Sequence, residues 1–272
     1  MQRLVHEWRL LLVAVQFLTR VPVRIPLQQG RFDPAWLHAS ARHFPLVGAA
    51  VGVAGALVLC AAAALWPAPA AIAVLLSMAA TVWLTGGFHE DGLADTCDGL
   101  GGAVDRERAL EIMKDSRLGS YGALGLLLTL ALKAAALCAL LAAAGPLATG
   151  VAMVLAHGLS RAATVVLLVV LPYGGDPAHA KAKPLAQQVG GASLAVGLAW
   201  ALLLATGAVA AGWPPVRVAA LAAAMATVAA VCARWLRRRL GGYTGDGLGA
   251  TQQWTELAGY LALASAWPAG AP

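Results

Sequence analysis

The chain has 272 residues, of which 60% are hydrophobic and 12% are charged, and its formal net charge is +6. Soluble domains are roughly 45–50% apolar and about 25% charged, so the composition excludes an ordinary soluble protein. Apolar and polar residues do not alternate, which argues against a transmembrane β-barrel. The positive charge fits basic cytoplasmic loops and requires no nucleic acid. We therefore predict an all-α, polytopic integral membrane helical bundle that forms one domain over residues 1–272.

The first twenty residues contain an apolar run that is interrupted by Arg9 and is not followed by a small-residue cleavage site. The run is short for a membrane span, so we expect an interfacial or re-entrant helix. The four cysteines are scattered without paired spacing, which argues against a disulfide framework and against a zinc site.

Six further apolar stretches approach the length of about 20 residues that a helix needs to cross a bilayer. A shorter apolar segment near 254–268 predicts another re-entrant or surface helix. The six transmembrane helices are expected at roughly 44–66, 69–88, 119–144, 146–171, 191–213 and 215–235.

The connections between these spans alternate between short and polar. The short ones fall on one side of the membrane, and the polar ones, which carry most of the lysines and arginines, fall on the other. The positive-inside rule makes the polar side cytoplasmic, so these connections are predicted to form the active-site loops. They cover about 20–43, 89–118, 173–190 and 234–253.

The stretch HEDGLADTCDG, residues 89–99, holds four carboxylates in a chain with few charges. On a helix, Asp91, Asp95 and Asp98 share one face, where three like charges repel one another. Such an arrangement is tolerable when a cation lies among them, and oxygen ligands favour Mg²⁺, Mn²⁺ or Ca²⁺. We therefore predict a metal site on this face, with Glu90 beside it.

The same connection continues as RERALEIMKDSRLGSYG, in which carboxylates, cations and glycines are mixed. This mixture suits a metal-bound phosphate, with Asp115 as a further metal ligand and with Lys114 and Arg117 binding phosphoryl oxygens. For residues 106–108, surface salt bridges are the simpler interpretation.

Polar residues also interrupt the predicted spans. His157 and Arg161 are four residues apart in the fourth span. An arginine at that depth costs at least about 2.5 kcal/mol, so Arg161 is expected to pair with a carboxylate or with a substrate phosphate. His157 and Lys133 are equally consistent with a functional and with a purely structural position.

Near the end of the chain, GGYTGDGLGA places five glycines around Thr244 and Asp246. We expect a flexible turn whose amides line a phosphate or nucleoside, on the same side as the acidic cluster. Asp246 is a candidate metal ligand or base.

Several blocks of the sequence resemble the cobalamin synthase family of adenosylcobinamide-GDP ribazoletransferases. The blocks are FLTRVPV, FPLVGAAVG, TGGFHEDGLADTCDGLGG, ALEIMKDSRLGSYGALGLLL, and GGYTGDGLGA followed by Gln252 and Glu256. The likeness covers nearly the whole chain. It departs after the fourth span, where Gly174 and Gly175 follow Tyr173 in place of Ala-Arg, and Lys181 or Lys183 is expected to substitute for that arginine.

The resemblance implies a Mg²⁺-dependent enzyme of a bacterial inner membrane, with an active site that faces the cytoplasm. Such an enzyme joins adenosylcobinamide-GDP to α-ribazole or its 5′-phosphate and releases GMP. The expected metal ligands are Asp91, Asp95, Asp98 and Asp115. The expected catalytic residues are Glu90 or Asp98 as the proton acceptor, with Lys114, Arg117 and Arg161 on the phosphoryl oxygens. The expected substrate contacts are Thr244, Asp246 and Gln252.

Other functions remain open. CDP-alcohol phosphotransferases also place spaced aspartates on membrane helices, and DTCDG resembles part of their motif, but the remainder of the motif is absent. Aspartate-rich membrane prenyltransferases are a further alternative. Cation transporters also cluster carboxylates, although near the bilayer midplane and in broken helices. Small-molecule substrates and membrane lipid are the expected partners, and a homo-oligomer is left open.

Overall fold

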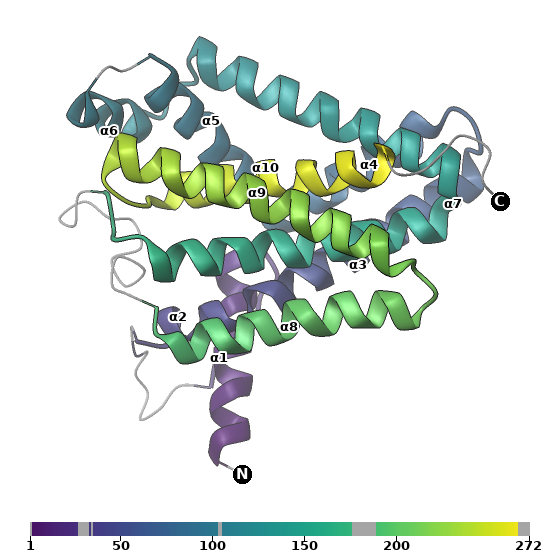
Figure 1. The fold of residues 1–272 in the computed structure, drawn as a ribbon, viewed down its shortest axis with the longest axis horizontal. Coiled ribbons are helices and arrows are strands. Elements are labelled where there is room, and N and C mark those ends of the chain that lie inside the picture. Colours follow the sequence, from purple (N-terminus) through teal and green to yellow (C-terminus); the bar gives the residue numbers. More distant parts are fainter. Residues whose placement is uncertain (1, 27–32, 34, 103–104, 176–188, 266–272) are drawn as a thin grey trace.

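The computed structural model describes residues 2–26, 33, 35–102, 105–175 and 189–265, and these form helices with an isolated β-bridge between Tyr173 and Tyr243 (Figure 1). The elements are α1 (Gln2–Leu18), α2 (Ala35–Ser40), η1 (Ala41–His43), α3 (Phe44–Leu65), α4 (Ala70–Thr85), α5 (Phe88–Gly102), α6 (Arg106–Lys114), α7 (Ser120–Val170), α8 (Gly191–Ala210), α9 (Pro215–Leu240) and α10 (Gly245–Ser265).

In the described part of the chain, four helices are long and apolar enough to cross a membrane, and a fifth crossing results if the bent pair α4–α5 is one span. One of the four, α7, has 51 residues. At 1.5 Å per residue it would be about 77 Å long, more than twice the hydrocarbon core of a bilayer. Gly145 has a non-helical backbone and divides α7 into two halves that run in opposite directions (Figure 1). The halves match the predicted spans at 119–144 and 146–171, so the predicted all-α, polytopic membrane bundle is confirmed.

The predicted span at 69–88 is shorter in the structure and sharply bent. Helix α4 ends at Thr85, and α5 begins at Phe88 after a bend of 89°. Gly86 and Gly87 form the bend with φ angles of 77° and 72°, a region that favours glycine. Helix α4 has 16 residues and covers only about 24 Å, so it ends inside the bundle. The acidic motif therefore begins inside the bundle, whereas a connection over 89–118 had been expected at its surface.

Helix α10 also differs from the prediction. It begins at Gly245, ahead of the expected segment at 254–268, and it packs against α5, α7 and α9 in the centre of the bundle. Tyr260 and Leu263 on this helix are fully buried, so the expectation of a surface helix is wrong. The glycine-rich segment, expected to be a flexible turn, is mostly the first turns of α10.

Helix α1 runs across the direction of the crossing helices (Figure 1). Its Glu7 binds Arg42 at 2.8 Å, while Leu4 and Trp8 on the same helix are exposed. At its end, the ring of Phe17 contacts the rings of Phe44 and Phe88, with centroids 5.8 and 5.5 Å away. Helix α1 therefore fixes the start of α5.

Close packing between α3 and α7 depends on small residues, as is common where lipid offers no hydrophobic drive for helix association. A Cβ on Gly52 would lie 2.7 Å from the Cα of Val154, and one on Gly48 would lie 2.6 Å from Cδ of Arg161. The buried apolar residues form two main clusters, one that includes Leu59, Leu137 and Trp213 and one that includes Phe44, Leu100 and Tyr243.

Candidate functional site

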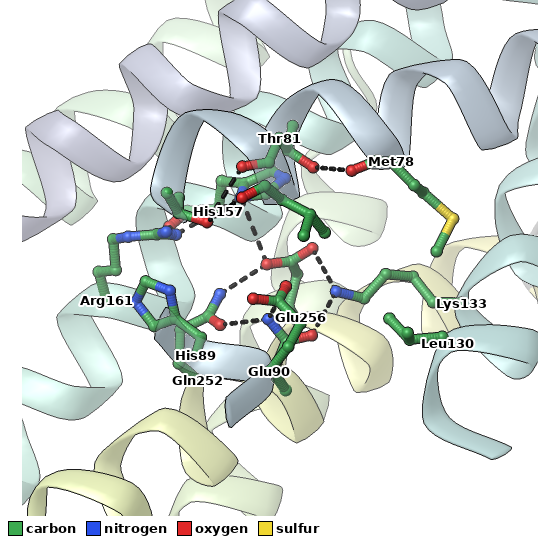
Figure 2. A pocket seen from close by; sticks show the side chains of 13 residues that line it. Met78, Thr81, His89, Glu90, Leu130, Lys133, His157, Arg161, Gln252 and Glu256 are labelled. Atoms are coloured by element: carbon green, nitrogen blue, oxygen red, sulfur yellow. Dashed lines mark hydrogen bonds and ion pairs between the residues drawn. The ribbon is translucent and has the colours of Figure 1, made fainter. Parts of the chain in front are cut away.

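A cluster of charged and amide side chains lies in the middle of the bundle, with Glu256 at its centre (Figure 2). The Lys133 ammonium is 3.0 Å from Oε1 of Glu256, and Nδ1 of His157 is 3.3 Å from Oε2. The Gln252 amide donates to Oε2 at 2.6 Å, and the Tyr260 hydroxyl donates to Oε1 at 3.3 Å. Glu256 is 1% exposed, so its charge depends on these neighbours for compensation.

The depth of this cluster follows from its positions on α7. Lys133 lies about midway between Ser120 and Gly145, and His157 lies about midway between Gly145 and Val170. Each is therefore separated by roughly 18 Å of helix from either end of its half. Both contact Glu256, so α10 lies between the two halves of α7 at mid-depth.

A second set of hydrogen bonds connects this cluster to the acidic motif. Lys133 Nζ donates to Oε1 of Gln253 at 2.6 Å, and Nε2 of Gln253 donates to Oε1 of Glu90 at 2.9 Å. Nε2 of Gln253 also donates to Oε1 of Gln252 at 2.9 Å. These bonds join α7, α10 and α5 around one point.

Arg161 is 2% exposed and lines the same space as the two glutamates. Its Nη1 donates to the backbone oxygen of His157 at 3.0 Å, whereas its Nε has no hydrogen-bond partner among the described residues. The predicted pairing of this arginine with a carboxylate or a substrate phosphate stays a prediction. The formal charges around this space balance, because two cations and two carboxylates line it: Lys133, Arg161, Glu90 and Glu256.

The cavity itself is small, with a volume of about 20 Å³. Such a volume holds about one water molecule. Its wall includes Thr81, His89 and Glu90, and Oε2 of Glu90 is buried without a partner in the described part of the chain. Two residues that line the cavity, Glu90 and Arg161, therefore each have a buried polar atom without a partner in the described part of the chain.

A second zone lies further along α5, where this helix meets the start of α10. A Cβ on Gly92 would lie 3.0 Å from both the Cα and the carbonyl oxygen of Asp246. A Cβ on Gly249 would lie 3.2 Å from the oxygen of His89. The acidic motif and the glycine-rich motif, far apart in the sequence, are thus in contact, whereas the sequence predicted only that they lie on the same side of the membrane. On α5, Asp91 is exposed and Asp95 is half-buried.

Two of the predicted site residues complete helix termini. The carboxylate of Asp98 accepts the backbone N–H groups of Gly119 and Gly122 at 2.8 and 2.7 Å, so it caps the start of α7. The hydroxyl of Thr244 accepts the N–H of Gly247 at 3.0 Å and caps α10 in the same way. Asp98 and Thr244 therefore have structural partners that sequence patterns did not reveal.

The residues around α6 form exposed ion pairs. Arg117 binds the carboxylate of Asp115 at 2.6 Å, and the hydrogen bonds from Arg117 lower the pKa of Asp115 to about 2. Arg108 binds Glu111 at 2.8 Å across one helical turn, in agreement with surface salt bridges. Lys114 is exposed on the same helix.

Arg106 has a different environment from its neighbours. It donates to the backbone oxygens of Leu240 and Gly174 at 2.8 and 2.7 Å. It thereby ties α6 to the end of α9 and to the segment where the family pattern has Ala-Arg. Lys181 and Lys183, expected to substitute for that arginine, lie outside the described residues.

The residues present fit a hard divalent ion by donor chemistry. Asp91 and Asp95 are one turn apart on α5, with Asp246 near the same helix. Mg²⁺ is often bound by one or two carboxylates that share it with waters and substrate phosphates. Within the residues that the structure describes, no group of three His, Cys, Asp or Glu side chains is arranged to hold a metal ion. The metal site therefore stays a prediction.

Sequence reasoning missed part of the buried cluster. His89 and Gln253 were not selected, Lys133 was left undecided, and Glu256 entered only through the family resemblance. The usable signal was Gln252, Gln253 and Glu256 in an otherwise apolar helix, because polar residues buried in such a helix need partners.

These observations define a polytopic helical membrane protein with a balanced charge cluster at mid-depth. Beside the break between α4 and α5, Asp91 and Asp95 form what we call the aspartate face of α5. A family model described as Cobalamin-5-phosphate synthase matches residues 10–264, and the chain belongs to this family.

Curated relatives support the assignment over almost the full length. The chain is 60% identical to an adenosylcobinamide-GDP ribazoletransferase of Leptothrix cholodnii, over 98% of this chain and 99% of the relative. It is 44% identical to proteins of the same name from Shewanella amazonensis, over 96% and 97%, and from Ralstonia nicotianae, over 92% of each chain. No solved structure matches the chain.

The position of Glu90 does not by itself separate a transferase from a transporter. Glu90 lies inside the bundle beside a broken helix, which is where transporters place carboxylates. The expected location of the whole acidic cluster in a surface loop is therefore wrong for this residue. Family membership provides the distinction that position does not.

Proposed function

We propose that the chain is an adenosylcobinamide-GDP ribazoletransferase. In this reaction it transfers the adenosylcobinamide phosphate group of adenosylcobinamide-GDP to α-ribazole or α-ribazole 5′-phosphate and releases GMP. The curated relatives of that name support the proposal, as does the contact between Gly92 and Asp246, which brings the two polar motifs together. This contact is the structural observation that carries the proposal.

The chemistry requires a ribose hydroxyl to attack the phosphorus that bears the cobinamide group. A new phosphorus–oxygen bond forms, the bond to GMP breaks, and GMP leaves with the electron pair. The hydroxyl proton passes to a base. Both oxygens of Asp98 accept backbone N–H groups, whereas Oε2 of Glu90 has no partner in the described region. We therefore assign the proton acceptor to Glu90.

Asp91 and Asp95 would hold Mg²⁺, with Asp246 approaching from α10. Mg²⁺ would neutralise the diphosphate charge that builds up on the leaving group. Asp98 and Asp115 contribute less to this site because a helix cap and Arg117 respectively occupy their carboxylates.

The cations have distinct positions in the proposal. Lys114 and Arg117 are exposed near the start of α7, where they can contact a phosphate from the aqueous side. Arg161 provides positive charge from the buried side of α5. Gln252 is buried and donates to Glu256 and Ser160, so its role is to hold Glu256 in place rather than to contact substrate. Asp246 and the α10 backbone are then the proposed substrate contacts from the glycine-rich motif.

The proposed location is a bacterial inner membrane with the active site on the cytoplasmic side. Arg237, Arg238 and Arg239 lie in the last turn of α9, within the predicted cytoplasmic connection 234–253. Their positive charge agrees with the positive-inside rule. Lipid contacts along the exposed apolar faces and a homo-oligomer remain predictions.

The direct test is GMP release by purified protein in detergent, with adenosylcobinamide-GDP, α-ribazole and Mg²⁺. We expect GMP release that needs both substrates and stops when EDTA removes the metal. CDP-alcohol and prenyl-diphosphate substrates serve as controls for the two alternative enzyme classes. Turnover of either control substrate without GMP release from adenosylcobinamide-GDP would contradict the proposal.

A further inference from the structure

We propose that Lys133 and Gln253 are positioning residues for Glu90, and that the Lys133 ammonium holds the amide oxygen of Gln253 while the amide nitrogen holds the Glu90 carboxylate. The inference rests on the proposed transferase function. It concerns residues at mid-depth that touch neither the aspartate face of α5 nor the exposed cations.

The direction of each hydrogen bond follows from the chemistry of its donor. A lysine ammonium has three donors and no acceptor, so the group that it meets on Gln253 at 2.6 Å is the amide oxygen. The amide nitrogen of Gln253 then faces the other way, and it donates to Oε1 of Glu90 at 2.9 Å. The same nitrogen also donates to Oε1 of Gln252 at 2.9 Å, so a neutral side chain in place of Lys133 would leave the amide oxygen of Gln253 buried without its donor.

Glu256 keeps Lys133 in place. The two side chains are 7% and 1% exposed, and their charged atoms are 3.0 Å apart. Glu256 is in turn held by Gln252, which also donates to the hydroxyl of Ser160 at 3.0 Å. The ammonium is therefore fixed by a buried ion pair, and it holds the amide oxygen of Gln253 in place.

The two oxygens of Glu90 differ in their partners. Oε1 is bound by Gln253, whereas Oε2 is buried without a partner among the described residues, and Glu90 lines the one-water cavity. A carboxylate held by one oxygen keeps its second oxygen in a defined direction. Asp91 follows directly on α5, so the same contact also limits the movement of the aspartate face.

The experiment separates positioning from simple cross-linking of the helices. Lys133→Met leaves the Glu256 carboxylate buried without its ion-pair partner, and such a loss is strongly destabilising. The double variant Lys133→Met/Glu256→Gln removes both charges, so its melting temperature in detergent should recover towards that of the wild type. We expect its kcat for GMP release to stay about 10- to 100-fold low while KM for α-ribazole changes little, because the amide of Gln253 is no longer held at its oxygen by Lys133.

A second variant makes the test independent of the ion pair. Gln253→Met preserves the Lys133–Glu256 pair and removes the amide with its bonds to Lys133, Glu90 and Gln252, so we expect a similar fall in kcat with the same small change in KM. Ser77→Ala is the matched control, because it removes a buried hydrogen bond to the oxygen of Gly55, at 2.8 Å, elsewhere in the bundle. Lys133→Arg restores a cation and should recover part of the kcat lost in Lys133→Met.

Two results would overturn the inference. One is wild-type kcat in Gln253→Met, and the other is a double variant that regains stability and kcat together, since a purely structural pair predicts that outcome. If the wild-type protein releases no GMP from adenosylcobinamide-GDP and α-ribazole, the proposed function fails instead, and the two failures are therefore distinguishable.

Discussion

Gly92 on α5 packs directly on Asp246 at the start of α10, with space for a hydrogen atom but not for a methyl group. A Cβ at this position would lie 3.0 Å from the Cα of Asp246 and 3.0 Å from its carbonyl oxygen. Both atoms belong to the backbone and cannot move aside as a side chain can. The distance between the two polar motifs is therefore set by the absence of a side chain at Gly92.

Gly92→Ala is expected to separate the two helices and to lower kcat for GMP release. The required shift is a few tenths of an ångström, so the loss should be smaller than the loss of about 100-fold that a misplacement of about 1 Å causes. Gly207→Ala on α8 is the matched control, because its Cβ would meet no atom within 4 Å. An alanine inside a helix favours folding by roughly 0.5–1 kcal/mol, so Gly207→Ala should keep full activity and gain slightly in stability. Equal activities of the two variants would contradict this account of the contact.

The bend between α4 and α5 offers a comparison of two adjacent glycines. Gly86 and Gly87 both have positive φ, and alanine at either costs about 1–2 kcal/mol of folding free energy from backbone strain. A Cβ on Gly87 meets nothing within 4 Å, whereas one on Gly86 would displace the guanidinium of Arg20. Gly86→Ala should therefore be the more destabilising variant in thermal unfolding in detergent.

An Arg20→Ala background tests whether a clash with the Arg20 side chain causes the difference in stability between the two variants. If the extra loss of stability in Gly86→Ala comes from Arg20, it should disappear when Gly86→Ala and Gly87→Ala are each made separately in an Arg20→Ala background. A difference that persists without the arginine side chain would show that another contact is responsible.

Asp98 is expected to act mainly through stability. Asp98→Ala leaves the N–H groups of Gly119 and Gly122 without their acceptor, at a cost of about 1–2 kcal/mol in unfolding free energy. Asp98→Asn keeps one acceptor oxygen and should lose less. The Mg²⁺ concentration for half-maximal activity should stay near the wild-type value in Asp98→Asn. An increase as large as that in Asp95→Asn would identify Asp98 as a metal ligand.

The membrane spans could be predicted because an uncharged apolar run of about 20 residues is characteristic of a helix that crosses a bilayer. The bend after α4 was missed because the run at 69–88 is apolar throughout, although Gly86 and Gly87 marked the break. Helix α10 was placed too late because Gln252, Gln253 and Glu256 lower the hydropathy of its first half. These residues are acceptable inside the bundle only because Lys133 and His157 meet them, and such pairings depend on tertiary contacts.

The candidate site was predicted in part for the same reason. The sequence predicted the acidic and glycine-rich motifs on one side of the membrane, and their direct contact could be seen only in the structure. The helix-capping bonds of Asp98 and Thr244 could not be anticipated, because each depends on how the ends of α7 and α10 are placed. Lys133 was undecided because its partner Glu256 lies far along the chain.

The central claim is that the aspartate face of α5 serves a metal-bound diphosphate. The most direct measurement is the rate of GMP release by Asp95→Ala in detergent with saturating Mg²⁺, adenosylcobinamide-GDP and α-ribazole, in a preparation whose thermal unfolding matches the wild type. We predict a loss of at least about 100-fold in kcat, because the proposed metal ligand is gone. A folded Asp95→Ala protein with near-normal Mg²⁺-dependent activity would contradict the claim.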